Sequence, residues 1–506
     1  MFPFKSNIAI DKSLKTPIYQ QISQQLMVLI REGKLSFGQK LLSSRALSEA
    51  LGVHRKTITQ VFDELISQGW LETKQGNGTF VAQNLPEIIP QFLEENQKSQ
   101  KSKSAGFVFE KKDFLIREVI KATDKLHLDD GFPDPRLAPL ADLARAYRSN
   151  LILGSSYQKL GYSDTKGSLW LRKELAKYLN ETRGLNISEN NLLIVRGTIM
   201  GLYLTSLAFI KAGDKVAIGE SSWQSANISF LQAGAELLKV PIDENGLDVD
   251  ALEELCKNHT IRLIYITSHH NYPTTVTLKA DRRIKLLQLA QKHKFIIFED
   301  DYDYDFHYQS RPLMPLASAD NQGMVLYSGS FTKSISPAFR VGYFVATEDV
   351  IEHLAHYRRI IDRQGDNMLE NAIAQLLHEG IIQKYLRKGL KEYKIRRDFF
   401  CEELKNVLGN LVDIQIPEGG MSVWVKFADE IDMQKTAKTA LKNELYLSSG
   451  VHHNVEGKIK NYTRLGFASS TIEELREAIG VLKSSLQFTS APLSEHGLLN
   501  ESVSAQ

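Results

Sequence analysis

A lysine on a turn of small residues is the first candidate for covalent chemistry in this chain. Lys333 follows the strand-like run 324–326 and two serines, Ser328 and Ser330, and Arg340 comes seven residues later. A primary amine forms a Schiff base with an aldehyde, while hydroxyl groups and a guanidinium bind phosphate. The pattern therefore indicates an aldehyde cofactor that also carries a phosphate. A solvated lysine on a loop has the same local pattern, so other residues must decide.

The end of a second strand-like run carries a carboxylate and a tyrosine. Asp300 and Tyr302 follow the apolar run 295–298. A carboxylate at this place can keep a pyridine nitrogen protonated, and a tyrosine two residues later can contact a phenolic oxygen of the same ring. Alternatively, such acidic residues are helix caps or surface charges, which is our interpretation of Asp303 and Asp305.

Two further strand ends could hold a phosphorylated ring. Gly197 and Thr198 follow the run 191–195 and open a helix, where backbone N–H groups and the helix dipole favour a phosphate. A glycine between a strand and a helix is usually a packing device, so this signal is weak alone. Trp223 follows the run 215–218 and could lie over a planar ring, although large aromatic residues more often belong to the core.

These candidate residues need a sheet whose strands end at one edge. Short β-rich runs alternate with helical patterns beyond residue 126, which predicts a large α/β domain with a mainly parallel sheet. The expected strands cover residues 191–195, 215–218, 263–266, 295–298, 324–327 and 342–346.

The first 84 residues predict a smaller domain of another type. Gly52 can make a sharp turn between two helices, and Gly76 and Gly78 suit the turn of a β-hairpin. The expected elements are a helix over residues 17–33, a short helix capped by Ser43 or Ser44, a helix from His54 to Gln68, and strands over residues 70–74 and 79–81.

Three helices and a β-wing make a winged helix-turn-helix, and this stretch resembles the N-terminal domain of GntR-type regulators. The resemblance rests on residues 43–45, 51–57 and 76–81, with departures at Leu42 and Lys56. It implies that the start of the third helix enters the major groove of operator DNA. The residues that would contact DNA are Arg55, Lys56, Thr57 and Gln60, with Arg45 and Lys74 on the backbone. An exposed charged face on a small helical domain is the alternative.

From about residue 128 to residue 486 the chain resembles the fold type I pyridoxal-phosphate enzymes of the class I and II aminotransferases. The order of glycine-threonine, aromatic residue, Asp-x-Tyr, Ser-x-x-Lys and arginine carries the resemblance. It implies that pyridoxal 5′-phosphate forms a Schiff base with Lys333, that Asp300 pairs with the pyridine nitrogen and that Tyr302 contacts ring O3′. The resemblance also implies, by position, that Trp223 stacks on the ring and that the phosphate is held by Gly197, Thr198, Ser330 and Arg340. Tyr162 would reach the phosphate of the other subunit, and Tyr272 replaces an asparagine that touches O3′. Arg464 would bind a substrate carboxylate, and Gly131 lies in a loop that lines the substrate site.

The two resemblances together match one group, the MocR/GabR family of regulators, over nearly the whole chain. The family resemblance implies a head-to-tail homodimer that binds an operator with paired half-sites, and an amine or amino-acid effector that displaces Lys333 from the cofactor. We expect a winged helix-turn-helix domain at 1–84, a flexible linker at 85–125, an aminotransferase-like domain at 126–486 and a disordered tail at 487–506.

Three functions compete at this stage. The first is a transcription regulator that senses an amino compound or the cofactor itself, and the second is a working aminotransferase with an incidental or autoregulatory winged helix. The third is a DNA-binding protein with a degenerate pocket, which the retention of Lys333, Asp300, Tyr302 and Arg340 disfavours. We expect the first, although every residue needed for transimination is present, so the sequence does not exclude turnover.

Composition sets broad limits on these functions. The chain has 506 residues, 42% of them hydrophobic, and a net charge of +2, so it can bury at least two cores and any basic surface must be local. Residues 1–84 hold ten Lys and Arg against six Asp and Glu. Cys256 and Cys401 lack metal spacing and are expected to be buried, without a zinc site. Without a signal peptide or a membrane-spanning run, we expect a cytoplasmic protein.

Overall fold

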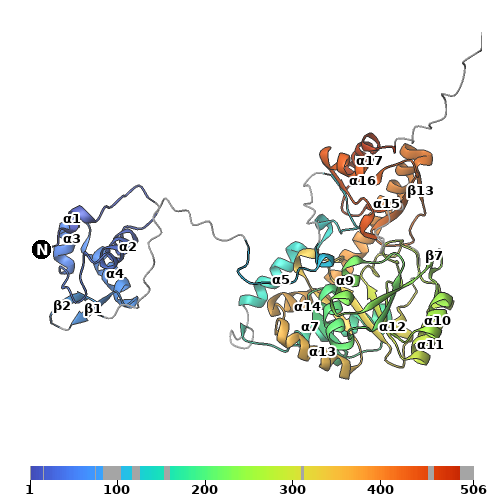
Figure 1. Ribbon diagram of the computed structural model, residues 1–506, viewed down its shortest axis with the longest axis horizontal. Coiled ribbons are helices and arrows are strands. Elements are labelled where there is room, and N and C mark those ends of the chain that lie inside the picture. Colours follow the sequence, from blue (N-terminus) through green and yellow to red (C-terminus); the bar gives the residue numbers. More distant parts are fainter. Residues whose placement is uncertain are drawn as a thin grey trace, which may run out of the picture. The chain divides into compact units, whose positions relative to one another are not determined.

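The computed structural model divides into two compact units, Met1–Glu110 and Lys111–Gln506 (Figure 1). It describes residues 2–14, 16–74, 76–83, 104–116, 126–152, 160–308, 313–453 and 461–489. Most of the predicted linker, and the predicted tail beyond residue 489, lie outside these residues. Within the described ranges, the helices are all too short or too polar to cross a membrane.

The N-terminal unit contains the predicted three helices and β-hairpin. Leu71 pairs with Val81 in an antiparallel ladder. Gly52 ends the second of the three predicted helices, at residues 44–51, with a φ of 66°, which a residue with a side chain rarely adopts. One helical turn, α1, was not predicted because only four residues form it, although Phe4 is buried. The elements are α1 (Phe4–Asn7), α2 (Ile18–Arg31), α3 (Ser44–Leu51), α4 (Arg55–Ser67), β1 (Leu71–Lys74) and β2 (Gly78–Val81).

The three longer helices of this unit pack around one apolar core. Ile22 and Leu26 of α2, Leu47 of α3, and Ile58 and Leu65 of α4 are all completely buried. They recur at helical spacing within each helix, which is why the hydrophobic pattern predicted the helices. The core fixes the start of α4 beside the start of α3.

Ser43, and not Ser44, caps α3, since its Oγ accepts a hydrogen bond of 3.2 Å from the N–H of Ala46. We expect Ser43→Ala to destabilise the N-terminal unit by about 1 kcal/mol, because one backbone N–H loses its partner. Ser44→Ala is the matched control, since Ser44 lies inside the helix, where alanine is favourable. Hydrogen exchange of peptides covering α3 measures the difference. Equal protection in the two variants would contradict this capping role.

A seven-stranded sheet forms the centre of the larger unit, in the order β4-β12-β11-β10-β9-β5-β6. Strand β12 runs antiparallel to both of its neighbours, and the other pairs are parallel, so the sheet is mainly parallel as predicted. Six of the strands were predicted, and the edge strand β6 was not, because its residues are half exposed. The strands are β4 (Leu192–Val195), β5 (Lys215–Gly219), β6 (Glu236–Val240), β9 (Ile261–Ile266), β10 (Ile296–Asp301), β11 (Val325–Ser330) and β12 (Gly342–Val345).

Helices cover both faces of this sheet, so its strands read as continuous apolar runs. In β4, Leu193 and Val195 belong to one apolar cluster with α8, α9 and α13, while Leu192 and Ile194 belong to the other with α7, α11 and α14. Cys256 and Cys401 are buried, as predicted, and burial raises the pKa of Cys401 to about 12. The helices around the sheet are α7 (Leu169–Arg183), α8 (Thr198–Phe209), α9 (Gln224–Gln232), α10 (Val249–Asn258), α11 (Ala280–His293), α12 (Leu316–Ala319), α13 (Glu348–Ile361) and α14 (Asn367–His378).

The C-terminal part of this unit has its own small sheets. Strand β14 pairs with β13 and β16 in an antiparallel sheet, and β15 pairs in parallel with β3, from the start of the unit. This pairing brings the loop after β3 beside β16. The remaining elements are α5 (Leu140–Ile152), α15 (Ile381–Leu408), α16 (Met433–Lys442), α17 (Ile472–Ser485), β3 (Leu126–Leu128), β7 (Ile242–Asp243), β8 (Gly246–Leu247), β13 (Val412–Ile414), β14 (Ser422–Phe427), β15 (Leu445–Leu447) and β16 (Tyr462–Gly466).

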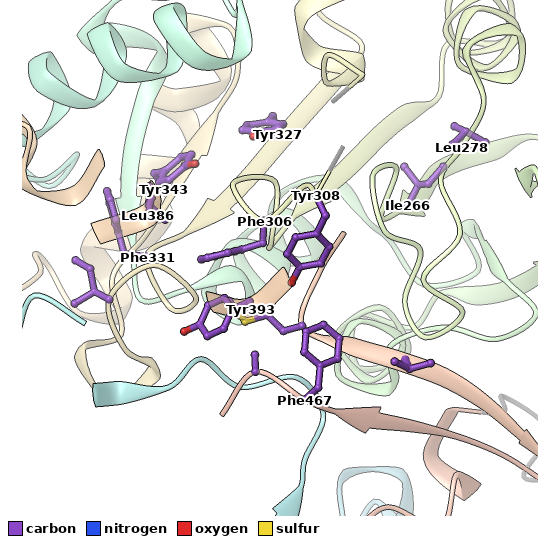
Figure 2. Close-up of a cluster of buried hydrophobic side chains, with 14 of the residues drawn as sticks. Ile266, Leu278, Phe306, Tyr308, Tyr327, Phe331, Tyr343, Leu386, Tyr393 and Phe467 are labelled. Carbon is purple, nitrogen blue, oxygen red and sulfur yellow. The ribbon is translucent and has the colours of Figure 1, made fainter. Parts of the chain in front are cut away.

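Aromatic side chains join the central sheet to the C-terminal part. Figure 2 shows Phe306 and Tyr308, which follow β10, beside Tyr393 of α15 and Phe467 at the end of β16. The ring centroids of Phe306 and Tyr393 lie 5.5 Å apart, and those of Tyr308 and Phe467 lie 6.5 Å apart. Burial of such rings contributes strongly to core stability. This cluster therefore fixes β16 relative to the strand ends that form the site.

Candidate functional site

A cavity of about 310 Å³ opens where strands of the central sheet end. Parallel β9, β10 and β11 finish at the same edge, which is where ligands bind in open α/β sheets. The loop after β3 and strand β16 contribute the opposite wall. Nine of the predicted site residues line the cavity: Thr198, Trp223, Tyr272, Asp300, Tyr302, Ser330, Lys333, Arg340 and Arg464.

Lys333 points into this cavity from the turn after β11. Its Nζ donates a hydrogen bond of 2.5 Å to the carbonyl of Gly131 and lies 5.1 Å from the ring centre of Phe132. Burial lowers the pKa of Lys333, and the nearby Asp130 carboxylate partly opposes that shift. A lowered pKa increases the share of neutral amine, which is the form that attacks a carbonyl carbon.

Asp300 is a buried carboxylate at the end of β10, only 3% exposed. It accepts hydrogen bonds from Tyr265 Oη at 2.9 Å and Thr198 Oγ1 at 3.2 Å. Burial raises its pKa to about 7, more than those two hydrogen bonds lower it. A cationic group bound next to such a carboxylate would stabilise its ionised form.

A group of anion-binding donors lies at the start of α8. Thr198 begins that helix, Ser330 ends β11, and the guanidinium of Arg340 reaches back so that its Nη2 donates to the carbonyl of Arg196 at 2.9 Å. A Cβ on Gly197 would lie 2.8 Å from that guanidinium and would displace it, and the φ of 75° at this position also favours glycine. Hydroxyls, a helix N-terminus and an arginine together suit a phosphate.

Arg464 of β16 forms the other end of the cavity, and its side chain is 2% exposed. Its Nη2 donates to Tyr302 Oη at 3.2 Å, and its Nη1 donates to the carbonyl of Pro273 at 3.2 Å. Its Nε lies 3.1 Å from Oδ1 of Asp130, whose Oδ2 accepts a hydrogen bond of 2.5 Å from Tyr272 Oη. The arginine is thus surrounded by oxygen atoms of the protein itself.

Two predicted residues contribute backbone to the site, and one lies apart from it. Gly131 offers its carbonyl to Lys333, and Gly197 leaves room for Arg340. Tyr162 does not line the cavity of its own subunit: it is 77% exposed, and the Arg363 guanidinium lies 3.8 Å from its ring centre. Its predicted role concerned the phosphate of another subunit, which a single chain does not test.

The interpretation of Asp303 and Asp305 as caps or surface charges was wrong. Asp303 is buried, with Oδ1 2.8 Å from Nδ1 of His270. Asp305 accepts hydrogen bonds from Tyr178 Oη at 2.7 Å and Arg183 Nη2 at 3.0 Å. The chain turns inward after β10, so both carboxylates meet partners that come from distant parts of the sequence.

Six cavity-lining residues were not among the predicted site residues: Asp130, Phe132, Ile199, Tyr265, Thr332 and Pro337. Tyr265 had a signal, since it is a hydroxyl-bearing residue near the end of the apolar strand β9. Phe132 lies in the loop of residues 131–134 that was expected to line the substrate site, but nothing local indicated that Asp130 faces the cavity. Asp130 meets Arg464 only because β3 pairs with β15 and lies beside β16.

In the N-terminal unit, the candidate DNA-binding side chains lie at the starts of α3 and α4 and on β1. Arg55, Lys56 and Gln60 of α4 are exposed, and the first turn of that helix contains no acidic residue. Arg45 is exposed beside Glu49, and Arg55 Nε lies 3.4 Å from Ser44 Oγ. Thr57 is half-buried, and Lys74 is exposed with Nζ 5.0 Å from the Phe80 ring centre.

Comparison with known families matches each unit separately. The family described as "Aminotransferase class I and II" matches residues 123–482, which is more than half of the chain. The family described as "Bacterial regulatory proteins, gntR family" matches residues 18–81. The first match covers the cavity, and the second covers the three helices and the hairpin.

Individual relatives share this arrangement or one part of it. An uncharacterized HTH-type transcriptional regulator of Bacillus subtilis, YisV, is 28% identical over 92% of this chain and 94% of its own length. A probable rhizopine catabolism regulatory protein of Rhizobium meliloti, MocR, is 25% identical over 94% of this chain and 95% of its own.

Among solved structures, an α-aminoadipate aminotransferase of Thermus thermophilus, LysN, in complex with N-(5′-phosphopyridoxyl)-L-leucine, superposes with a TM-score of 0.67. It is 26% identical and covers 71% of this chain and 92% of its own. This chain belongs to the aminotransferase class I and II family and carries a gntR-family domain ahead of it, as the MocR-type regulators do.

Proposed function

We propose that this protein is a DNA-binding transcription regulator that holds pyridoxal 5′-phosphate on Lys333 and senses a primary amine, an amino acid or the coenzyme itself. One observation carries the proposal: a half-buried lysine and a buried carboxylate face one cavity in a chain that also contains a winged helix-turn-helix. The similarity to YisV and MocR over nearly their full lengths supports it.

The residues of the cavity fit pyridoxal 5′-phosphate. This coenzyme supplies an aldehyde that condenses reversibly with primary amines, on a pyridine ring that withdraws electrons. Lys333 offers the amine, Asp300 a carboxylate for the ring nitrogen, and Trp223 an aromatic face. Thr198, Ser330 and Arg340, around the small Gly197, supply the donors that a phosphate requires. Tyr272 and Tyr302 are the candidate hydroxyl partners of the ring oxygen.

Sensing would follow from competition for the coenzyme. An incoming amine would release Lys333, whose ammonium group would then be free to bind the Gly131 carbonyl and the Asp130 carboxylate. A ligand shifts a conformational equilibrium only by its differential affinity for the two states. We propose that this exchange changes the conformation of the Gly131 loop, which directly follows β3, and that operator affinity changes with it.

We also propose that the regulator is a homodimer. Ile199, Tyr203 and Leu207 occur four residues apart on α8 and are each 44% to 47% exposed, so they form an apolar stripe. Ile199 also lines the cavity. A second copy packed on this stripe would cover apolar surface and close the cavity on that side.

The decisive experiment separates a sensor from a working aminotransferase. The coenzyme-loaded full chain is mixed with single amines, and both absorbance and affinity for DNA from upstream of its own gene are recorded. A spectral change that alters operator affinity without forming pyridoxamine phosphate supports the regulator. Repeated turnover with a keto acid, together with an operator affinity that no amine changes, would support the enzyme instead.

Arg55→Ala is expected to weaken binding to operator DNA. The exposed guanidinium at the start of α4 would neutralise a phosphate or contact a base. Loss of one phosphate contact reduces the slope of log affinity against log salt by about one. Fluorescence anisotropy at several salt concentrations measures both values. Lys34→Ala, an exposed lysine after α2, is the control. Unchanged affinity in Arg55→Ala would argue against α4 as the recognition helix.

A further inference from the structure

Asp130 is a carboxylate of the cavity that lies next to Arg464 as well as near Lys333. Its Oδ1 lies 3.1 Å from Nε of Arg464, and its Oδ2 accepts a hydrogen bond of 2.5 Å from Tyr272 Oη. The side chain is 39% exposed, whereas that of Arg464 is 2% exposed. The arginine is thus the fixed partner, and Asp130 approaches it from the side that is open to the cavity.

Every nitrogen of the Arg464 guanidinium already has a protein oxygen near it. Nη1 has the carbonyl of Pro273 at 3.2 Å, Nη2 has Tyr302 Oη at 3.2 Å, and Nε has Asp130. Two of these oxygens are neutral, so Asp130 supplies the negative charge that balances this buried cation. A buried arginine normally requires such a partner.

The backbone holds Asp130 in this place. The preceding residue, Asp129, is buried, and its Oδ1 accepts hydrogen bonds from the N–H groups of Gly131 at 2.8 Å and Phe132 at 2.7 Å. Its Oδ2 accepts a hydrogen bond of 2.6 Å from Ser469 Oγ, and its carbonyl accepts one of 2.7 Å from the N–H of Gly466. The loop is therefore fastened to the end of β16, the strand that carries Arg464.

This arrangement has a consequence for the ligand. A carboxylate brought to Arg464 would meet the Asp130 carboxylate at the same guanidinium, and like charges in a partly buried site repel each other. An amine without a carboxylate avoids this repulsion, and its ammonium form is attracted by Asp130 while it enters. The negative charge also lies near Lys333, at the place where an incoming amine must arrive.

We propose that Asp130 fills the carboxylate site of Arg464 and thereby selects primary amines that lack a carboxylate beside the amino group over α-amino acids. This inference rests on the proposed function and names its effector class. Asp130 is a specificity-determining residue in this role, and Arg464 is the residue through which it acts.

The test compares amines and amino acids that differ only in the carboxylate. The probes are isobutylamine with L-valine, phenethylamine with L-phenylalanine, and cadaverine with L-lysine. Dissociation constants are measured on the coenzyme-loaded full chain from absorbance and from the change in operator affinity. Because amino groups within a pair differ in basicity, the deciding quantity is how the affinity ratio changes between wild type and Asp130→Asn.

We expect wild type to bind the amine of a responding pair more tightly than the amino acid. Asp130→Asn should change that ratio in favour of the amino acid by roughly tenfold to a hundredfold, because it removes the repulsion between two carboxylates at one guanidinium. Asp130→Glu, which keeps the charge, should retain the preference for amines. Asp250→Asn removes the same charge from an exposed position on α10 and should leave the ratio unchanged.

A second readout does not depend on reaction with the coenzyme. Isobutyrate, a carboxylate without an amino group, should raise the melting temperature of Asp130→Asn and not that of wild type. The role of Asp130 would be overturned, without contradicting the proposed function, if wild type bound amino acids more tightly than the matched amines and Asp130→Asn left that ratio unchanged. Failure of the full chain to bind pyridoxal 5′-phosphate would overturn the proposed function itself.

Discussion

Lys333→Ala is expected to abolish the visible absorbance that incubation with pyridoxal 5′-phosphate should give to this protein, and with it every response of operator binding to amines. The Nζ of Lys333 is held in the cavity by the Gly131 carbonyl, and burial keeps its pKa below the ordinary value. Among the cavity-lining residues that the structure describes, no other has a primary amine. The loss should therefore be complete, and absorbance spectra after incubation with the coenzyme and gel filtration measure it.

A matched lysine shows whether the effect is specific. Lys173 lies exposed on α7, so Lys173→Ala should keep both the spectrum and the response to amines. Non-specific DNA binding by Lys333→Ala should equal that of wild type, because that binding depends on basic residues of the N-terminal unit. A Lys333→Ala protein that kept the wild-type spectrum would mean that another lysine reacts with the coenzyme.

Local pattern was enough to predict the sheet and one wall of the cavity. Buried strands such as β4 and β10 are apolar on both faces, so each appears as a short run, and residues that follow such runs at parallel strand ends must lie close together. That reasoning brought Asp300, Lys333 and Thr198 to one place. It failed for β6, where packing at the edge of the sheet leaves the strand half exposed and without a clear apolar run.

The opposite wall could not be predicted from local pattern because distant segments form it. Arg464 was expected to bind a ligand carboxylate, and nothing near it in sequence indicated that Asp130 lies 3.1 Å away. Their contact depends on the pairing of β3 with β15 and on the bonds of Asp129 to β16. The predictions for Asp303 and Asp305 were wrong for the same reason, because their partners His270, Arg183 and Tyr178 come from other parts of the sequence. Charge pairing in a core is decided by topology, which local periodicity does not contain.

Asp300→Asn is expected to have opposite effects on stability and on coenzyme binding. The carboxylate of Asp300 is buried, and its pKa rises from 3.8 to about 7 because burial disfavours the charged form. Between these pH values the folded state binds more protons than the unfolded state, so this group makes the wild type less stable as pH rises from about 4 to 7. Asparagine does not titrate. The stability of Asp300→Asn relative to wild type should therefore increase across that window and remain constant above it.

The size of this effect follows from the shift in pKa. One pKa unit corresponds to about 1.4 kcal/mol, so the coenzyme-free variant should gain between about 2 and 4 kcal/mol relative to wild type from pH 4 to pH 8. Urea denaturation of the coenzyme-free larger unit, followed in the full chain, measures it. Asp413→Asn, at an exposed position of β13, is the control and should show no such trend. A relative stability that fell with rising pH would contradict a raised pKa.

When the coenzyme is bound, we expect Asp300→Asn to be unfavourable. A protonated pyridine nitrogen bound next to Asp300 would stabilise the ionised carboxylate, and asparagine cannot replace that charge, so we expect affinity for pyridoxal 5′-phosphate to fall at least tenfold, or about 1.4 kcal/mol. Replacing a residue that served only packing would lower stability in both forms of the protein. A carboxylate that destabilises the coenzyme-free protein but stabilises the coenzyme-bound protein is instead a residue whose energetic cost is offset by its ligand. Titration of both proteins with the coenzyme at pH 8 distinguishes the two cases.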